Sequence, residues 1–128
     1  MASLKIIPTY HSDQAYLILD EVEAVTVTIG VGGLGNADSQ LLLDVIWLLS
    51  GKLKQVKDHV EKIDYECVAF ELEEITKLVR QALALSVVIG EGDLSKVDSE
   101  KVSRVMLLIG RLCEQAKMKI VKIEPMAA

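Results

Sequence analysis

The chain has 128 residues, enough for one domain with its own core and short for two. Hydrophobic residues make up 51% of it and aromatic residues only 4%, so the core must be aliphatic, and the apolar surplus favours a buried interface as well. A net charge of -5 argues against nucleic acid as the main partner. No signal-peptide pattern opens the chain, and no apolar run approaches the roughly 20 residues of a membrane span. We therefore expect a cytoplasmic protein without membrane insertion.

Residues 24–63 recur as residues 84–123, at an offset of 60. Fourteen of these forty positions are identical, and unrelated segments of ordinary composition would match at only a few. The identical positions are 24, 27, 29, 30, 32, 34, 38, 39, 45, 48, 55, 57, 62 and 63, each compared with its partner sixty later. The pattern predicts an internal duplication within a single domain, 1–128, with repeat units of about 12–63 and 65–124.

Apolar residues recur every three or four positions through four segments, which is the period of a helix face. After a short extended arm over residues 1–11, helices are expected over about 12–29, 42–63, 68–89 and 102–123. Residues 24–29 alternate β-branched side chains and, taken alone, indicate a strand. Their duplicate, residues 84–89, continues a segment that favours helix. Because duplicated segments share a structure, we predict helix for both.

Residues that start and stop helices flank these segments. Gly30 and Gly90 are predicted as left-handed residues just after a helix, and Asp38 and Asp98 as N-caps. Pro125 is expected to end the fourth helix. The breaks between segments are short, so consecutive helices should be antiparallel neighbours. The predicted fold is all-α: an up-down-up-down antiparallel four-helix bundle built from two duplicated helical hairpins.

The first glycine-rich loop, Gly30–Gly35, resembles the G-x-G-x-x-G fingerprint of dinucleotide-binding proteins. That resemblance implies a phosphate site at Gly30, Gly32 and Gly35. The second copy of the loop carries Glu91 and Asp93, which would repel phosphate, and Ser95 in place of the third glycine. The comparison favours a loop that closes a helical hairpin and leaves nucleotide or phosphate binding as an alternative.

The segment His59-Val60-Glu61-Lys62 resembles the His-x-x-Lys core of histidine phosphotransfer domains, which are also small acidic helical bundles. The resemblance implies that His59 carries a phosphoryl group and that Lys62 offsets its charge. Ile63 stands where that family has a small glycine. The other interpretation is a histidine at the surface or at the boundary of the core.

Metal-binding and catalytic patterns are otherwise absent from the sequence. Di-metal bundles require Glu-x-x-His segments, and none occurs. Cys67 and Cys113 are isolated and are expected to be buried free thiols. We predict no metal, no cofactor and no catalytic residue, with His59 as the one weak candidate, and favour a non-enzymatic protein.

Charge is spread unevenly along the chain. Between Ala24 and Gly51 the only charged residues are Asp38 and Asp44, and between Gln81 and Gly90 there are none. Both stretches adjoin the glycine loops, which antiparallel topology places at one end of the bundle. A helix that is apolar on every side must be buried on more than one side. The sequence therefore predicts association, as a homo-oligomer or with a protein partner, through an apolar end. The expected interface residues are Leu43, Trp47, Phe70, Ala84 and Val88.

Overall fold

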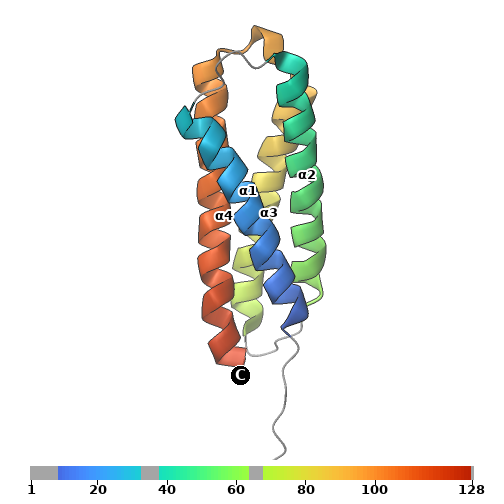
Figure 1. Ribbon diagram of the computed structural model, residues 1–128. Coiled ribbons are helices and arrows are strands. Elements are labelled where there is room, and N and C mark those ends of the chain that lie inside the picture. Colours follow the sequence, from blue (N-terminus) through green and yellow to red (C-terminus); the bar gives the residue numbers. More distant parts are fainter. Residues whose placement is uncertain (1–8, 33–37, 64–67, 128) are drawn as a thin grey trace, which may run out of the picture.

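A computed structural model describes residues 9–32, 38–63 and 68–127, with 124–127 described in their backbone only. These ranges form four α-helices and one short 3-10 helix, and they contain no strand. The elements are α1 (Tyr10–Gly32), α2 (Ser39–Glu61), α3 (Ala69–Glu91), η2 (Leu94–Lys96) and α4 (Ser99–Ala127). The prediction of an all-α four-helix bundle is confirmed (Figure 1).

Each helix packs against two others, so that α1, α2, α3 and α4 close into a ring. Lys52 of α2 donates a hydrogen bond to Glu21 of α1, while His59, in the last turn of α2, contacts His11 at the start of α1. Partner numbers fall on one helix as they rise on the other, which is the register of oppositely directed helices. In Figure 1 the four helices alternate in direction along the chain.

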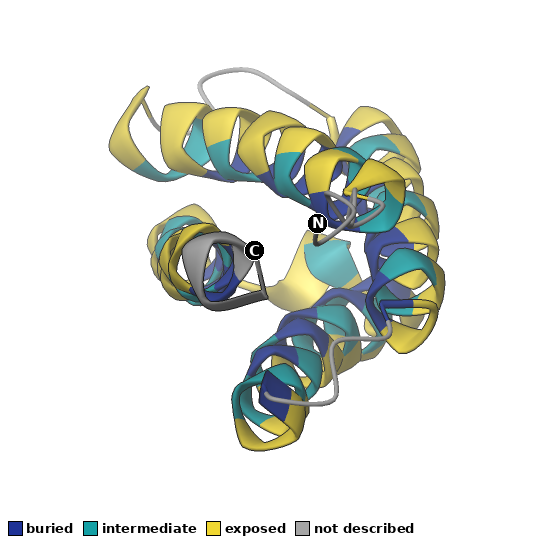
Figure 2. Cartoon of the chain, turned by 90° about the horizontal axis from the view of Figure 1, so that it is seen from below, coloured by how far each residue is buried: buried dark blue, intermediate teal, exposed yellow. Residues whose placement is uncertain are grey.

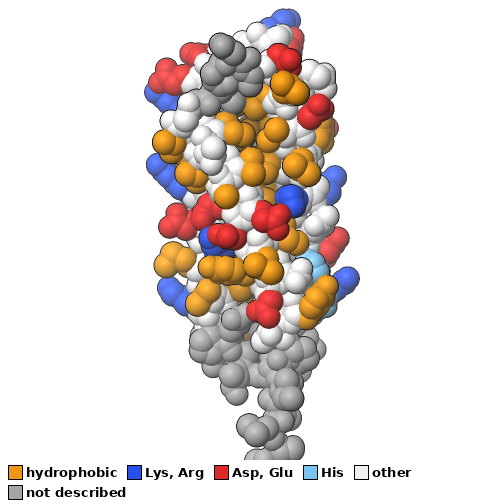
Figure 3. All heavy atoms as spheres, viewed as in Figure 1, with side chains coloured by type: hydrophobic (Ala, Val, Ile, Leu, Met, Phe, Trp, Pro, Cys, Tyr) orange, Lys and Arg blue, Asp and Glu red, His pale blue; other side chains and the backbone are white. Residues whose placement is uncertain are grey.

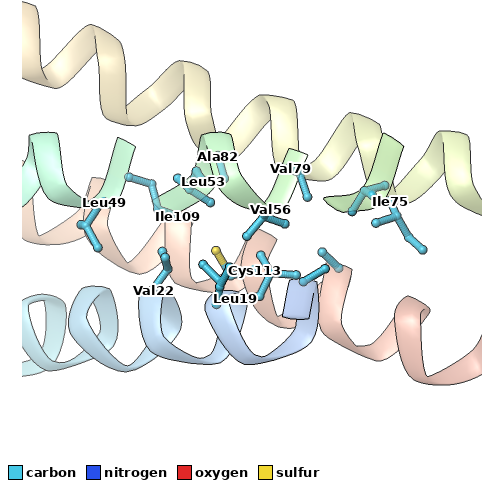
Figure 4. Packing of buried hydrophobic residues seen from close by; sticks show 14 of the residues in the cluster. Leu19, Val22, Leu49, Leu53, Val56, Ile75, Val79, Ala82, Ile109 and Cys113 are labelled. Atoms are coloured by element: carbon cyan, nitrogen blue, oxygen red, sulfur yellow. The ribbon is translucent and has the colours of Figure 1, made fainter. Parts of the chain in front are cut away.

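The core is aliphatic, as the composition requires. Figure 2, a view along the bundle, shows the buried faces turned inward and the exposed faces outward. Side chains from all four helices point toward one another in Figure 4, among them Leu19, Leu53, Val79 and Ile109, all 0–1% exposed. Burying a side chain of this size stabilises the fold by about 1.5–3 kcal/mol before the entropy of ordering the chain is counted.

The predicted N-caps are confirmed. The Asp38 carboxylate accepts a hydrogen bond from the Leu41 N–H at 2.8 Å, and the Asp98 carboxylate accepts one from the Glu100 N–H at 3.0 Å. Each aspartate thus satisfies a backbone donor that has no partner within its own helix.

Residues 24–29 lie inside α1, as predicted from their duplicate. Thr26 is buried, and its hydroxyl donates to the Val22 carbonyl at 2.9 Å. The Thr28 hydroxyl donates to the Ala24 carbonyl at 2.6 Å. The β-branched threonines therefore satisfy their polar atoms within the helix, although their local preference is for strand.

The expectation that Gly30 and Gly90 are left-handed residues just after a helix is wrong. Each lies within a helix rather than after it. A Cβ atom on Gly30 would lie 2.5 Å from Leu107 Cγ, and one on Gly90 would lie 3.1 Å from Trp47 Cζ2. The glycines are needed because a neighbouring helix approaches closely, not because the backbone turns. The C-cap of α3 is Gly92, whose φ of -79° is open to any residue.

The other correction concerns the ends of α1 and α4. Helix α4 continues through Pro125 to Ala127, because a proline so near the end of a helix removes only one N–H bond. Helix α1 begins at Tyr10, so the last two residues of the expected arm are helical. Residues 1–8 lie outside the described part of the chain.

The two halves of the bundle use equivalent positions for equivalent contacts. Gly30 faces Leu107. The equivalent pair is Gly90 with Trp47, in which each residue lies sixty positions from its counterpart in the first pair. Thr26 faces Gly110, and the equivalent pair is Ser86 with Ser50, whose hydroxyls lie 2.8 Å apart. These contacts give the bundle a pseudo-twofold arrangement, while duplication of an ancestral hairpin stays a prediction from the sequence.

We expect Gly30→Ala to destabilise the protein by about 1–3 kcal/mol, because the added methyl group overlaps Leu107 in a packed contact. Gly51→Ala is the matched control: this helical glycine has no atom within 4 Å of the added Cβ. Its gain in helix propensity should raise stability by about 0.5–1 kcal/mol. Urea unfolding followed by circular dichroism measures both. Equal effects of the two substitutions would contradict the close approach of α1 and α4.

Candidate functional site

Exposed apolar side chains gather on α1 and α2 in the half of the bundle that leads to the glycine loops. We name this the loop-half surface and define it by Val25, Leu41 and Leu48, with Trp47 at its border toward α3. Leu48 is 56% exposed and Trp47 is 41% exposed. Figure 3 shows hydrophobic side chains clustered over the upper half of the face that α1 and α2 form. Apolar groups are normal on protein surfaces singly, but a contiguous patch marks a site of interaction.

The register of α2 explains how this patch arises. Leu41, Leu48 and Lys52 follow the spacing of one helix face, and Lys52 reaches Glu21 on α1 at 2.8 Å. The side of α2 that borders α1 is therefore ionic near its middle and apolar toward the loops. Val45 on the same side is partly buried against the core.

Trp47 occupies the opposite side of α2, toward α3. Its ring lies over Gly90, which leaves room for it by lacking a side chain. The indole thus contributes one face to the packing of α2 on α3 and keeps two fifths of its surface for solvent or a partner. This position is compatible with the expectation that Trp47 belongs to an interface.

The remaining predicted interface residues are dispersed. Leu43, one turn before Trp47, is half-buried and borders a hollow of about 140 Å³ together with Leu94 of η2. Ala84 and Val88 lie on exposed positions of α3 near the loops, with Val88 69% exposed. Phe70 is 67% exposed, but it lies in the first turn of α3, about 27 Å along the helix from Val88. The five residues therefore do not form one patch.

A belt of ion pairs bounds the apolar surface. Lys117 of α4 donates to Asp20 at 2.7 Å and to Glu23 at 2.9 Å, both on α1, and its ammonium lies 5.3 Å from the Tyr16 ring centroid. Charged side chains cross the middle of the molecule in Figure 3. Burial lowers the pKa of Lys117, but the hydrogen bonds that its ammonium donates to Asp20 and Glu23 outweigh this effect and raise that pKa above its ordinary value.

The structure places His11 next to His59. His11 Nδ1 and His59 Nδ1 lie 2.9 Å apart, and the Tyr10 ring meets both imidazoles nearly edge-on. Burial is the main factor that lowers the pKa of His59, followed by the charges of His11 and Lys62, while Asp58 acts in the other direction. The pairing could have been anticipated from the antiparallel hairpin, which brings the start of α1 to the end of α2.

Gly30 and Gly32 do not form a phosphate cradle, because both belong to the last turns of α1. The C-terminal end of a helix presents carbonyl groups and partial negative charge, which disfavours phosphate. At the following N-terminus, the Asp38 carboxylate already occupies the position that an anion would take. Gly35 lies outside the described residues.

Nucleophilic and metal-binding groups are sparse in the described ranges. Cys113 is buried, and burial raises the pKa of its thiol to about 12, so the thiol stays protonated and unreactive at neutral pH. Cys67 is not among the described residues. No group of three or more His, Cys, Asp and Glu side chains there is placed to hold a metal ion.

No protein-family model, curated protein or solved structure matches the chain. Within the described residues, none of the helices combines the length and apolar character that crossing a membrane requires.

We expect Lys117→Met to destabilise the protein by about 1–3 kcal/mol at pH 7, because two carboxylates lose the cation that links α1 to α4. A lysine whose pKa rises on folding contributes fully below its unfolded pKa of about 10.4 and loses the contribution as pH climbs through the folded value. The difference from wild type should therefore be constant from pH 6 to 9 and shrink above pH 10. Lys101→Met, at an exposed position of α4, is the control for removing a lysine. Equal urea midpoints for the two variants would contradict the role of the belt.

Proposed function

We propose that this protein is a non-enzymatic helical protein that acts by association, with a second copy of itself as the partner. The observation that supports this most directly is the loop-half surface, where Val25, Leu41 and Leu48 expose apolar area and Trp47 exposes part of its ring at the border. Covering such a patch removes it from water, which is the main favourable contribution to protein association.

The distribution of exposed hydrophobic residues favours the loop half over the other half. Most of the large apolar side chains that the described chain exposes belong to it, including Val27, Val31, Val88, Val97 and Leu108. Charged residues are scarce on α1, α2 and α3 in this half, with only Asp38 and Asp44 between Ala24 and Gly51 and none between Gln81 and Gly90, and interface cores are depleted in charge. The opposite half exposes fewer of them: Tyr10, Leu17, Phe70, Met118 and Val121.

The border of the surface favours a second copy as the partner. A twofold interface pairs the same patch with itself, so its rim must complement itself. The belt beside the loop-half surface carries both signs, with Lys52 and Lys117 alternating with Asp20 and Glu21. Two copies related by a twofold axis can place the lysines of one copy against the carboxylates of the other. The apolar centre of the surface can pack against the same centre of the second copy. We place this association in the cytoplasm, in line with the sequence.

The histidine phosphotransfer alternative has less support. A phosphoryl carrier needs an accessible imidazole, whereas His59 is half-buried and its Nδ1 is engaged by His11. The nucleotide alternative is weakened by the helical glycines and by the capping carboxylate of Asp38.

We expect wild type to form a defined oligomer at micromolar concentration and Leu48→Glu to shift it toward monomer by at least about tenfold in dissociation constant, because a charge at an apolar interface must be desolvated. Leu17→Glu is the matched control: Leu17 is 53% exposed, like Leu48, but lies in the other half of the bundle. Size-exclusion chromatography with light scattering measures both. A monodisperse wild-type monomer, or equal effects of the two substitutions, would contradict the proposal.

Trp47 supplies a second measurement, because it is the only tryptophan in the chain. If association covers its exposed part, dilution through the dissociation constant should shift its fluorescence emission to longer wavelength. Leu48→Glu should show the shifted emission at all concentrations, and Leu17→Glu should follow wild type. An emission maximum that does not change with concentration while the oligomer dissociates would place Trp47 outside the interface.

A further inference from the structure

His11 at the start of α1 and His59 near the end of α2 hold their Nδ1 atoms at a separation that suits two ligands of one metal ion. His11 stands in the first turn of α1 and His59 in the last turn of α2, so both backbones are held by helices. The Nδ1 atoms are 2.9 Å apart and are hydrogen bonded, so the lone pair of one faces the N–H of the other. The Tyr10 ring lies beside both imidazoles, with centroid distances of 5.1 and 5.9 Å.

This distance suits a metal ion that binds ligands at right angles. Imidazole nitrogens bind Zn²⁺ at about 2.0–2.1 Å, which separates two of them by about 3.3 Å at a tetrahedral angle and by about 2.9 Å at 90°. Right-angle geometry is that of square-planar and octahedral Cu²⁺ and Ni²⁺ sites. The observed separation therefore matches two adjacent positions of such a site, and the rings need only rotate to aim both lone pairs at one ion.

We infer that His11 and His59 form a two-histidine binding site for a divalent transition metal ion of the Cu²⁺ or Ni²⁺ type. Water completes the coordination, since no third His, Cys, Asp or Glu of the described chain joins the pair in a potential metal group. The bound ion would link the first turn of α1 to the last turn of α2. The inference stands independently of the proposed association, because the site lies at the end opposite the glycine loops.

A metal ion binds the neutral form of imidazole. The ring whose Nδ1 carries the shared proton takes the Nε2–H tautomer, and both Nδ1 lone pairs become available. At low pH protons compete for the same nitrogens, so affinity falls.

The test uses the full chain without a histidine tag, because His11 and His59 are then its only histidines. Titration with NiCl₂ at pH 7.5 by calorimetry should give one ion per chain. His11→Gln and His59→Gln should each weaken binding by at least about tenfold, by analogy with the loss seen when metal-site partners are removed. The double variant should bind no ion at the concentrations used, and wild type should bind more weakly at pH 5.

Two variants serve as controls for other ligands. Tyr10→Phe keeps the ring and removes the phenol hydroxyl, and Cys67→Ser removes a thiol that lies outside the described residues. Both variants should bind like wild type. Electron paramagnetic resonance of the Cu²⁺ form should show coupling to two imidazole nitrogens, and metal should raise the melting temperature of wild type but not of the double variant. The inference would be overturned if nickel still bound after the loss of both histidines, or if folded wild type showed no saturable binding. Loss of binding in either control variant would overturn it as well.

Discussion

Close approach of helices at small residues controls the upper half of this bundle. Gly30 admits Leu107 of α4, and Gly90 admits Trp47 of α2, each at a separation that leaves no room for a Cβ atom without movement of the neighbour. The large side chain in each pair is thereby laid across the partner helix near the surface rather than in the core. The contact with Gly90 joins α2 to α3 and brings Trp47 to the border of the loop-half surface.

The charged belt separates this half from the rest of the molecule. Lys52 with Glu21 joins α1 to α2, and Lys117 with Asp20 and Glu23 joins α1 to α4. Exposed ion pairs contribute little to stability, but Lys117 of α4 is mostly buried and binds two carboxylates of α1. Toward the loops the same helix faces carry valine and leucine. Each face is therefore ionic near the middle of the bundle and apolar toward the loops.

At the other end of the bundle, a group of aromatic rings lies beside the aliphatic core. Tyr10, His11 and His59 bring three rings together where α1 begins and α2 ends. The loop-half surface and the histidine pair thus lie at opposite ends of the same helical hairpin. One offers apolar area for a macromolecular partner and the other offers nitrogen lone pairs for an ion.

Local sequence was a reliable guide where one helix decides the outcome. The period of apolar residues predicted four helices, Asp38 and Asp98 predicted their starts, and the duplicate of residues 24–29 corrected a local preference for strand. Gly30 and Gly90 were misassigned because glycine serves both turns and close helix contacts, and only the neighbouring helix distinguishes the two. Pro125 was misassigned because a proline near a terminus costs a single hydrogen bond.

The sequence by itself determined the all-α class, the aliphatic core and the scarcity of charge on the helix segments that lead to the glycine loops, since these depend on periodicity and composition. The tertiary structure alone decided which residues of different helices meet. It laid Trp47 over Gly90 and brought His11 to within hydrogen-bonding distance of His59. The physical reason is that spacing along one helix defines a face, whereas the register between helices decides which residues of different faces meet.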